Sequence, residues 1–294
     1  MRAPVTVGIP TYARGERVFA VLEKVLTCDP PPAEVIVHVD ASDGELEKRI
    51  AVRFPQVRVL SSAVRVGPGG GRHRCLLAAT QPYFASFDDD SWPVDTDYFQ
   101  IVDGIFKSHP KVAVLGAAIW HRHEEPVPRR VDVTKAVDFT GCGFAMRVAA
   151  YRGISGYVDR PIAYGVEEVD ISLQLHAAGW QVLRCGELRV FHDTQLVHHA
   201  TAEITAGTIQ NAALLAWLCY PPSLWGRGVL QTMNVLRFML RQGRRRGIFS
   251  GLMGIPHVLW RYRRERRPLP ASAVREYLAS RRSSKSLGVA KEMK

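Results

Sequence analysis

The chain has 294 residues, of which 47% are hydrophobic and 23% charged, a composition typical of a globular protein and unlike that of disordered or collagen-like chains. This length allows one large α/β domain with an appendage and a sizeable core. Five widely spaced cysteines, none in a Cys-x-x-Cys pair, favour neither a disulfide framework nor a zinc cage and predict a reducing, cytoplasmic setting.

The net charge of +11 is confined to the C-terminal part of the chain. Residues 227–294 contain 17 Lys and Arg against 3 Asp and Glu, whereas the rest of the chain contains 22 against 25. A mildly acidic body with a basic appendage favours a catalytic domain with an electrostatic anchor over a nucleic-acid groove.

The hydropathy pattern predicts neither an export signal nor a membrane-spanning segment. The N-terminus enters a strand-like run at once, without a charged region followed by an apolar one, so we expect no secretion signal. The longest apolar stretch, residues 212–219, is far shorter than the ~18–20 residues that a spanning helix needs.

The first 90 residues alternate short β-branched runs with helical periods, which predicts parallel strands flanked by helices. Strands are expected at residues 5–9, 35–39, 57–60 and 83–87. Helices are expected around residues 18–25, which Pro30 to Pro32 would end, at residues 43–53, and at residues 71–79 after a glycine-rich turn.

Polar residues follow these strands at one edge of the predicted sheet, where ligands bind in such folds. Pro10, Thr11 and Tyr12 follow the first strand, Asp40 the second and Arg65 the third. The run Asp88, Asp89 and Asp90 follows the fourth. We therefore predict a ligand site at this edge.

The sequence of the second half of the chain predicts a segment of helices and strands, followed by basic helices. A helix is expected at residues 98–107, a strand at 112–116, a loop at 141–143, and a helix that starts at Glu167 and ends near Gly179. After residue 194 the pattern predicts arginine-rich helices broken by Pro221, Pro222, Pro256 and Pro268.

Three consecutive aspartates repel one another unless a cation lies among them, and a hard divalent metal bound to phosphate oxygens would serve this purpose. The alternative is a helix N-cap cluster, because Asp caps helices and Pro93 and a helix follow. The position at the sheet edge favours the metal.

The other candidate residues also have structural alternatives. Asp40 suits a nucleotide base or ribose, or a simple turn. The glycines of residues 67–71 match neither a phosphate loop nor the dinucleotide fingerprint, which leaves a close backbone approach with Arg72 beside a diphosphate. His192 could complete an oxygen-rich metal site or be structural. His121, His123, His198 and His199 are predicted to be loop residues.

Glu167, Glu168 and Asp170 begin a helix whose apolar positions face the core. The acids can therefore project away from the core toward a ligand. The alternative is that they only complement the helix dipole.

Together these segments resemble the inverting glycosyltransferases of family 2, which have the GT-A fold. The likeness extends from residue 5 to residue 192. It consists of GIPTY at residues 8–12, Asp40 with Asp43 and Gly44, GGGR at 69–72, FDDD at 87–90, GCGF at 141–144 and GVEEVD at 165–170.

The resemblance implies an α/β fold with a Rossmann-like, mostly parallel sheet flanked by helices, which we assign to residues 1–195. The basic composition after residue 194 predicts a helical appendage at residues 196–294. It implies a Mg²⁺- or Mn²⁺-dependent transfer from a nucleoside-diphosphate sugar to a hydroxyl on a lipid-linked or small acceptor. Asp40 would bind the base, Asp88 the ribose side, and Asp90 with His192 the metal. The other nucleotide contacts would be Pro10, Thr11, Tyr12, Arg72 and Asp89.

On the acceptor side the resemblance implies Gly141, Cys142, Gly143 and Glu167. Glu168 occupies the position of the general base, where the family commonly has Asp, so Asp170 is the nearest substitute. Glu168 would remove the proton from the acceptor hydroxyl while Arg72 and the metal neutralise the leaving diphosphate.

The tail predicts an anchor. Val229, Met233, Leu236 and Leu240 share a helical face next to Arg241 and residues 244–246, a pattern that suits the anionic inner face of a membrane. The alternative is helices that pack on the body with a solvated basic face. Rival functions are a basic nucleic-acid-binding protein, which lacks a motif, and a sugar nucleotidylyltransferase, which would need another glycine-rich loop after the first strand.

Overall fold

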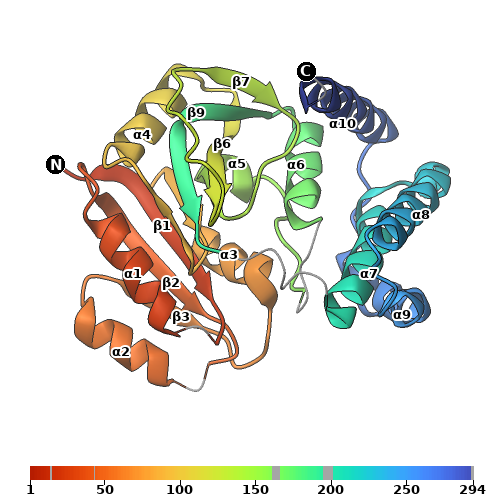
Figure 1. The fold of residues 1–294 in the computed structure, drawn as a ribbon, viewed down its shortest axis with the longest axis horizontal. Helices are drawn as coiled ribbons and strands as arrows, with labels where there is room; N and C mark the ends of the chain where they lie inside the picture. Colours follow the sequence, from red (N-terminus) through yellow and green to blue (C-terminus); the bar gives the residue numbers. More distant parts are fainter. Residues whose placement is uncertain (14, 43, 161–165, 195–200, 293–294) are drawn as a thin grey trace. The chain divides into compact units, whose positions relative to one another are not determined.

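The computed structural model describes residues 1–13, 15–42, 44–160, 166–194 and 201–292, with side chains as far as residue 283. The chain divides into two compact units (Figure 1). The first comprises Met1–Arg160 and Ala178–Gln195, and the second comprises Pro161–Ala177 and Leu196–Lys294. The helix α6 (Glu167–Ala177) thus groups with the C-terminal helices. The predicted domain boundary at residue 195 stays a prediction.

The strands of the first unit form one nine-stranded sheet in the described part of the chain. Their order is β3-β2-β1-β4-β8-β6-β9-β5, and β7 pairs with β9. The bounds are β1 (Ala3–Thr11), β2 (Pro32–Val39), β3 (Arg58–Ser61), β4 (Tyr83–Phe87), β5 (Ser91–Pro93), β6 (Val112–His121), β7 (Val133–Ala136), β8 (Gly143–Arg147) and β9 (Gln181–His192).

The four predicted strands are neighbours and run parallel, as are β6 and β9. Antiparallel β8 joins these two parallel groups. Alternate residues of β1 enter the core, because Val5, Val7 and Ile9 are fully buried in it. The α/β class with flanking helices is confirmed, whereas β5, β7 and β8 were not predicted, because each is at most five residues long and gives little pattern.

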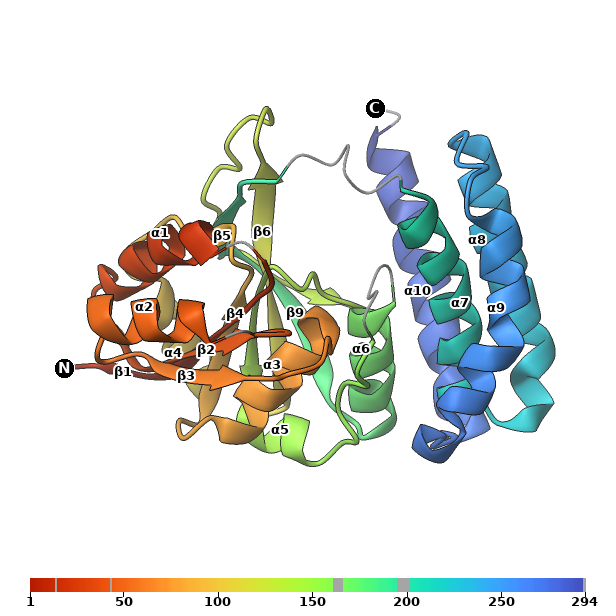
Figure 2. The same ribbon diagram turned by 90° about the horizontal axis from the view of Figure 1, so that it is seen from below.

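Helices cover both faces of this sheet. α1 (Gly15–Leu26) and α4 (Tyr98–Ser108) place their buried stripes in the core with the β1 valines, together with Ile50 of α2 (Glu45–Arg53). α3 (Gly67–Ala78) and the short α5 (Val148–Arg152) lie on the opposite face from α1 (Figure 2). The predicted helix at residues 98–107 is confirmed to within one residue.

α3 begins at Gly67, four residues earlier than predicted, so its glycines belong to the helix and not to a preceding turn. Pro68 is tolerated there because the first-turn N–H groups have no partner inside the helix. A Cβ on Gly71 would lie 2.8 Å from Pro10 Cβ and 3.0 Å from His38 Nδ1. The glycine therefore lets α3 approach the ends of β1 and β2 closely.

The second unit is helical in its described residues. Besides α6 it contains α7 (Ala202–Cys219), α8 (Trp225–Arg241), α9 (Ile248–Arg261) and α10 (Ala271–Glu292), with short 3₁₀ turns at Pro222–Leu224 and Arg263–Glu265. Within the described part of the chain, none of the helices has the length and apolar character that crossing a membrane requires.

The prediction that Pro256 breaks a helix is wrong, because this residue lies inside α9. Proline removes one hydrogen bond to the carbonyl of the residue four positions earlier. Here that residue is Leu252, which is 40% exposed, so the helix can continue past the proline with its unpaired carbonyl at the surface.

Candidate active site at the carboxyl edge of the sheet

The aspartate run directly follows β4, at the carboxyl edge that β1, β2 and β4 share. The helix-cap alternative does not hold for it. The short strand β5 separates Asp90 from α4, and the N-cap residue of α4 is Asp97. The three aspartates therefore have another role, and their side chains make three different sets of contacts.

Asp88 is the most exposed of the three, with 27% of its side chain accessible. It forms a very short ion pair with Arg72 of α3, whose Nε also lies 3.2 Å from Ser86 Oγ. The guanidinium of Arg72 is 97% buried, since only 3% of that side chain is exposed. The ion pair therefore ties the end of β4 to α3.

Asp89 and Asp90 are both buried, with 6% and 4% exposed. Asp89 Oδ2 accepts a hydrogen bond of 2.8 Å from Thr11 Oγ1, which ties the run to the end of β1. Asp90 Oδ1 lies 3.0 Å from His192 Nε2, and its Oδ2 lies 3.4 Å from Arg17 Nη1. The predicted pair Asp90 and His192 is thus in direct contact.

A group with metal-ligand geometry forms around Asp88. Among the described residues, one ligand atom each from Asp88, Cys142 and His192 lies within 4.8 Å of the others. The three come from different segments, and Ser91 holds these segments together. Its Oγ accepts from the Asp88 amide at 2.7 Å and donates to the Cys142 carbonyl at 2.7 Å, and Ser91 also pairs with His192 in the sheet.

Cys142 was predicted to contact the acceptor, and the structure places it with Asp88 and His192. Its neighbour Gly143 begins β8, where a Cβ would lie 3.0 Å from Val190 Cγ2. Gly141 is also buried and precedes this strand. Gly143 therefore lets the start of β8 lie against the Val190 side chain of β9, and the predicted contact of Gly141, Cys142 and Gly143 with an acceptor stays a prediction.

Asp40 organises the loop that leads into α3. Its Oδ1 accepts from Ser62 Oγ at 3.0 Å and from the Val66 amide at 2.9 Å, and its Oδ2 accepts from the Gly67 amide at 2.9 Å. Asp40 therefore acts as a cap for the N-terminus of α3, more than the simple turn that is its alternative. Its predicted contact with a nucleotide base stays a prediction.

Tyr12 offers an open aromatic surface at the end of β1. Its side chain is 43% exposed, and Arg65 Cζ lies 4.5 Å from the ring centroid. Pro10 is buried under α3 beside Gly71.

Deeper in the fold, burial lowers the pKa of His38, and the charge of Arg74 lowers it further, so this imidazole is neutral at pH 7.

The acids of α6 belong to the second unit. Glu167 and Asp170 are buried, whereas Glu168 is half-buried. Asp170 Oδ1 accepts from Gln174 Nε2 at 2.8 Å and from Cys219 Sγ at 3.1 Å, so it joins α6 to α7. These contacts favour Glu168 over Asp170 for chemistry, and both catalytic roles stay predictions.

Three residues near the site were missed by the sequence interpretation. Arg17 of α1 contacts Asp90, Ser91 bridges two ligand segments, and the His121 ring centroid lies 5.2 Å from that of His192. His121 ends β6, so its prediction as a loop residue is wrong, whereas His123 lies in a turn at φ 77°. Asp43, Gly165, His198 and His199 lie outside the described residues.

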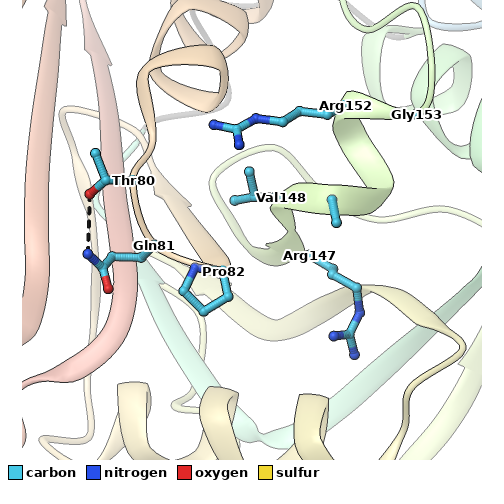
Figure 3. A pocket seen from close by; sticks show the side chains of 8 residues that line it. Thr80, Gln81, Pro82, Arg147, Val148, Arg152 and Gly153 are labelled. Carbon is cyan, nitrogen blue, oxygen red and sulfur yellow. Dashed lines mark hydrogen bonds between the residues drawn. The ribbon is translucent and has the colours of Figure 1, made fainter.

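A separate pocket of about 740 Å³ lies at the opposite end of β4, between the residues that precede β4 and α5 (Figure 3). Two arginines line it, and both donate to backbone carbonyls. Arg147 donates to the carbonyls of Phe106 and Val112, and Arg152 donates to that of Ala79. These hydrogen bonds give the two arginines a structural role, and the pocket is distant from the aspartate run along the strand.

Solved structures show the same fold at low sequence identity. A mannosyltransferase, PcManGT from Pyrobaculum calidifontis in complex with GDP-Man and Mn²⁺, is 14% identical with a TM-score of 0.55, over 95% of this chain and 86% of that one. GalNAc-T7 with UDP, GalNAc and Mn²⁺ is 14% identical with a TM-score of 0.57, over 74% and 48%.

TarS of S. aureus is 14% identical with a TM-score of 0.52, over 72% of this chain and 40% of that one. The chain thus spans less than half the length of TarS and of GalNAc-T7. No curated protein matches it by sequence. The model of the family described as "Glycosyl transferase family 2" matches residues 6–155, which include β1 to β4 and the aspartate run. With this match, on a GT-A-like fold, the chain belongs to glycosyl transferase family 2.

Proposed function

We propose that the chain is an inverting, metal-dependent glycosyltransferase that transfers a sugar from a nucleoside diphosphate to an acceptor hydroxyl. The observation that carries the proposal is the convergence of Asp88, Cys142 and His192 within 4.8 Å at the carboxyl edge of a family 2 sheet. Ligands of such sheets bind at this edge because loops and helix N-termini meet there.

The donor atoms of this group fit a divalent cation. A carboxylate oxygen, a thiolate sulfur and an imidazole nitrogen suit Mn²⁺ and other transition metals better than Mg²⁺, which prefers oxygen alone. Of the two cations predicted, Mn²⁺ is therefore the one we propose. Asp90, in contact with His192, would orient that ring or share in binding. A bound cation would supply positive charge to the diphosphate of the donor.

The nucleotide would lie along the ends of β1 and β2. The exposed Tyr12 ring can stack on a base, and Asp40 is fixed beside it by the loop into α3. Arg72 contacts Asp88 through its buried guanidinium and would add positive charge near the leaving group. GDP-Man and UDP-sugars in the related structures support a donor of this class.

The reaction would be a single displacement. Glu168 takes the proton of the acceptor hydroxyl as the hydroxyl oxygen forms a bond to the anomeric carbon of the sugar. The bond from that carbon to the phosphate oxygen breaks, and the nucleoside diphosphate leaves with the electron pair. Attack opposite the leaving group inverts the anomeric configuration.

Glu168→Gln tests the base, with Asp170→Asn as the matched variant. General-base catalysis contributes typically about 10²–10⁴-fold, so E168Q should lose turnover on this scale while it still binds donor. D170N should mainly destabilise the fold, because Asp170 bonds Gln174 and Cys219. Full turnover by E168Q would contradict the assignment. NMR of the product should show an inverted anomer and a nucleoside diphosphate, whereas pyrophosphate would indicate a nucleotidylyltransferase.

The acceptor hydroxyl, on a lipid-linked or a small molecule, remains a prediction of the sequence. Peripheral membrane association is also part of the proposal, and it depends on residues outside this site, those of α8 and α9. The exposed surface of these two helices combines apolar side chains with arginines, and this combination favours one kind of partner.

A further inference from the structure

α8 and α9 pack on α7 and carry glycines where they approach it most closely. A Cβ on Gly228 of α8 would lie 2.4 Å from Ala216 Cβ, and one on Gly251 of α9 would lie 3.0 Å from Ala206 Cα. Gly254 lies equally close to Gln210 of α7, where a Cβ would be 2.1 Å from Nε2. Glycines therefore let these helices approach α7 closely.

Several large apolar side chains of both helices are exposed. On α9, Phe249, Met253 and Trp260 are 78%, 65% and 64% exposed, and their spacing places them on one helical face. The equivalent stripe of α8 consists of Val229, Met233 and Leu240, which are 44–60% exposed. We call these six residues the outer apolar face. Helices that served only to cover a core would bury such side chains against α7.

Arginines surround this face without any acid to offset them. No Asp or Glu occurs between Glu203 and Glu265, whereas nine arginines occur from Trp225 to Arg264. Arg227, Arg237 and Arg241 of α8 are exposed, as are Arg245 and Arg246 between the helices. Arg263 Cζ lies 4.1 Å from the Trp260 ring centroid, so cation and apolar surface are in contact.

From this combination we propose that the outer apolar face docks on the surface of an anionic lipid bilayer. The apolar side chains would enter the boundary between headgroups and acyl chains, and the arginines would contact lipid phosphates. A second copy of the chain is a less favourable partner for this face than a lipid surface, because a symmetric contact would place two arginine-rich surfaces opposite each other. Docking needs neither donor nor metal, so this proposal and the proposed chemistry can fail independently.

Vesicle flotation of the full chain tests the apolar part. We expect binding to vesicles of phosphatidylcholine with phosphatidylglycerol, and a loss of at least about tenfold for Phe249→Ser/Met253→Ser/Trp260→Ser, since each lost apolar contact weakens partitioning. The matched control is Val52→Ser/Leu77→Ser/Val131→Ser, three side chains of the first unit that are 85%, 53% and 88% exposed. Thermal unfolding should be unchanged in both, because the substituted side chains are exposed.

The charged part is tested with Arg245→Gln/Arg246→Gln against Lys111→Gln/Lys135→Gln, which removes two exposed cations from the first unit. The arginine variant should lose several-fold in binding to anionic vesicles, and high salt should reduce the difference. The proposal is overturned if the wild-type chain does not float, if the lysine or Val52 controls lose as much, or if sedimentation shows a dimer that the α9 variant dissociates while vesicle binding is absent.

Discussion

In most proteins, charged side chains are exposed and large apolar side chains are buried. The carboxyl edge of the sheet departs from the first rule, and the outer apolar face of α8 and α9 departs from the second. At the sheet edge, charged groups such as Arg72, Asp89 and Asp90 are buried. On α8 and α9, residues such as Phe249 and Trp260 are exposed. Buried charge and exposed apolar surface each cost stability unless a partner compensates them. At the edge, Asp88, Thr11 and His192 compensate part of this charge, and the proposed metal and nucleotide sugar would add to it. At the helices, the proposed partner is a lipid surface.

The largest expected effect is at the sheet edge. Asp90→Ala removes the carboxylate that contacts His192 and Arg17, so we expect turnover to fall by about 100-fold or more, since the charge stabilisation supplied at a metal site amounts to several kcal/mol. The measurement is nucleoside diphosphate release as a function of Mn²⁺ concentration.

Asp103→Ala is the control, because this aspartate pairs only with Lys107 on the surface of α4 among the described contacts. Unchanged turnover and metal dependence in D90A would mean that the buried charges of the edge are structural. The edge would then need no ligand, and the comparison with α8 and α9 would no longer hold.

A second effect concerns the thiol at the edge. Cys142→Ser should weaken binding of Mn²⁺ or Co²⁺ by about tenfold, and binding of Mg²⁺ much less, because sulfur is a poor ligand for Mg²⁺. Isothermal titration measures both affinities, and Co²⁺ bound to the wild type should show a thiolate charge-transfer band that the variant lacks. Identical Co²⁺ spectra would remove Cys142 from the metal group.

A third effect tests whether the inner faces of α8 and α9 are the close-packed ones. Gly228→Ala should lower the free energy of unfolding by about 2 kcal/mol, since its Cβ would overlap with Ala216 and overpacking exceeds the gain in helix propensity. Gly226→Ala in the same helix has open space around its Cβ and should be neutral or stabilising. Equal effects in denaturant unfolding would mean that α8 does not approach α7 through Gly228.

The smallest effect concerns the framework beside the edge. Arg189 of β9 donates to both oxygens of Asp95, at 2.8 and 2.6 Å, and these bonds hold the pKa of Asp95 below its usual 3.8. A lowered carboxyl pKa contributes stability above the unfolded-state pKa, and this contribution is lost as the pH falls through the folded-state value.

Asp95→Asn should therefore cost about 1 kcal/mol at pH 7, and its difference from the wild type should shrink below pH 4. Urea unfolding over a pH series measures this. Gln242→Ala, which removes an exposed side chain that does not titrate, should show no such pH dependence. The same profile in both variants would assign the pH dependence to other carboxyl groups.

Local patterns were sufficient to predict the first half of the fold. The alternation of Val5, Val7 and Ile9, and the helical spacing of Val18, Val21 and Leu22, appear in β1 and α1 as expected. The common edge of Thr11 and Asp88 follows from parallel strands alone. In a parallel sheet the carboxyl ends of all the strands lie at the same edge. Local strand patterns are therefore enough to predict which residues meet there.

The contacts between distant segments could not be predicted. Cys142 meets Asp88 and His192 because β8 lies beside β4 and β6 lies between β8 and β9, and no local pattern encodes these pairings. The contact of Arg17 with Asp90 joins residues 73 positions apart for the same reason. On α8, the predicted face comprised Val229, Met233, Leu236 and Leu240. The structure exposes three of these side chains and half-buries Leu236, and no local pattern shows which way this face points.

Thermal unfolding with a panel of nucleotide sugars, each with and without Mn²⁺, tests the central claim most directly. A ligand that binds only the folded state must raise the melting temperature. We predict that one UDP- or GDP-sugar stabilises the wild-type chain only when Mn²⁺ is present, and that Asp88→Asn abolishes this stabilisation. No stabilisation by any nucleotide sugar and cation, or the same stabilisation in D88N, would contradict a metal-dependent nucleotide-sugar site at the edge of the sheet.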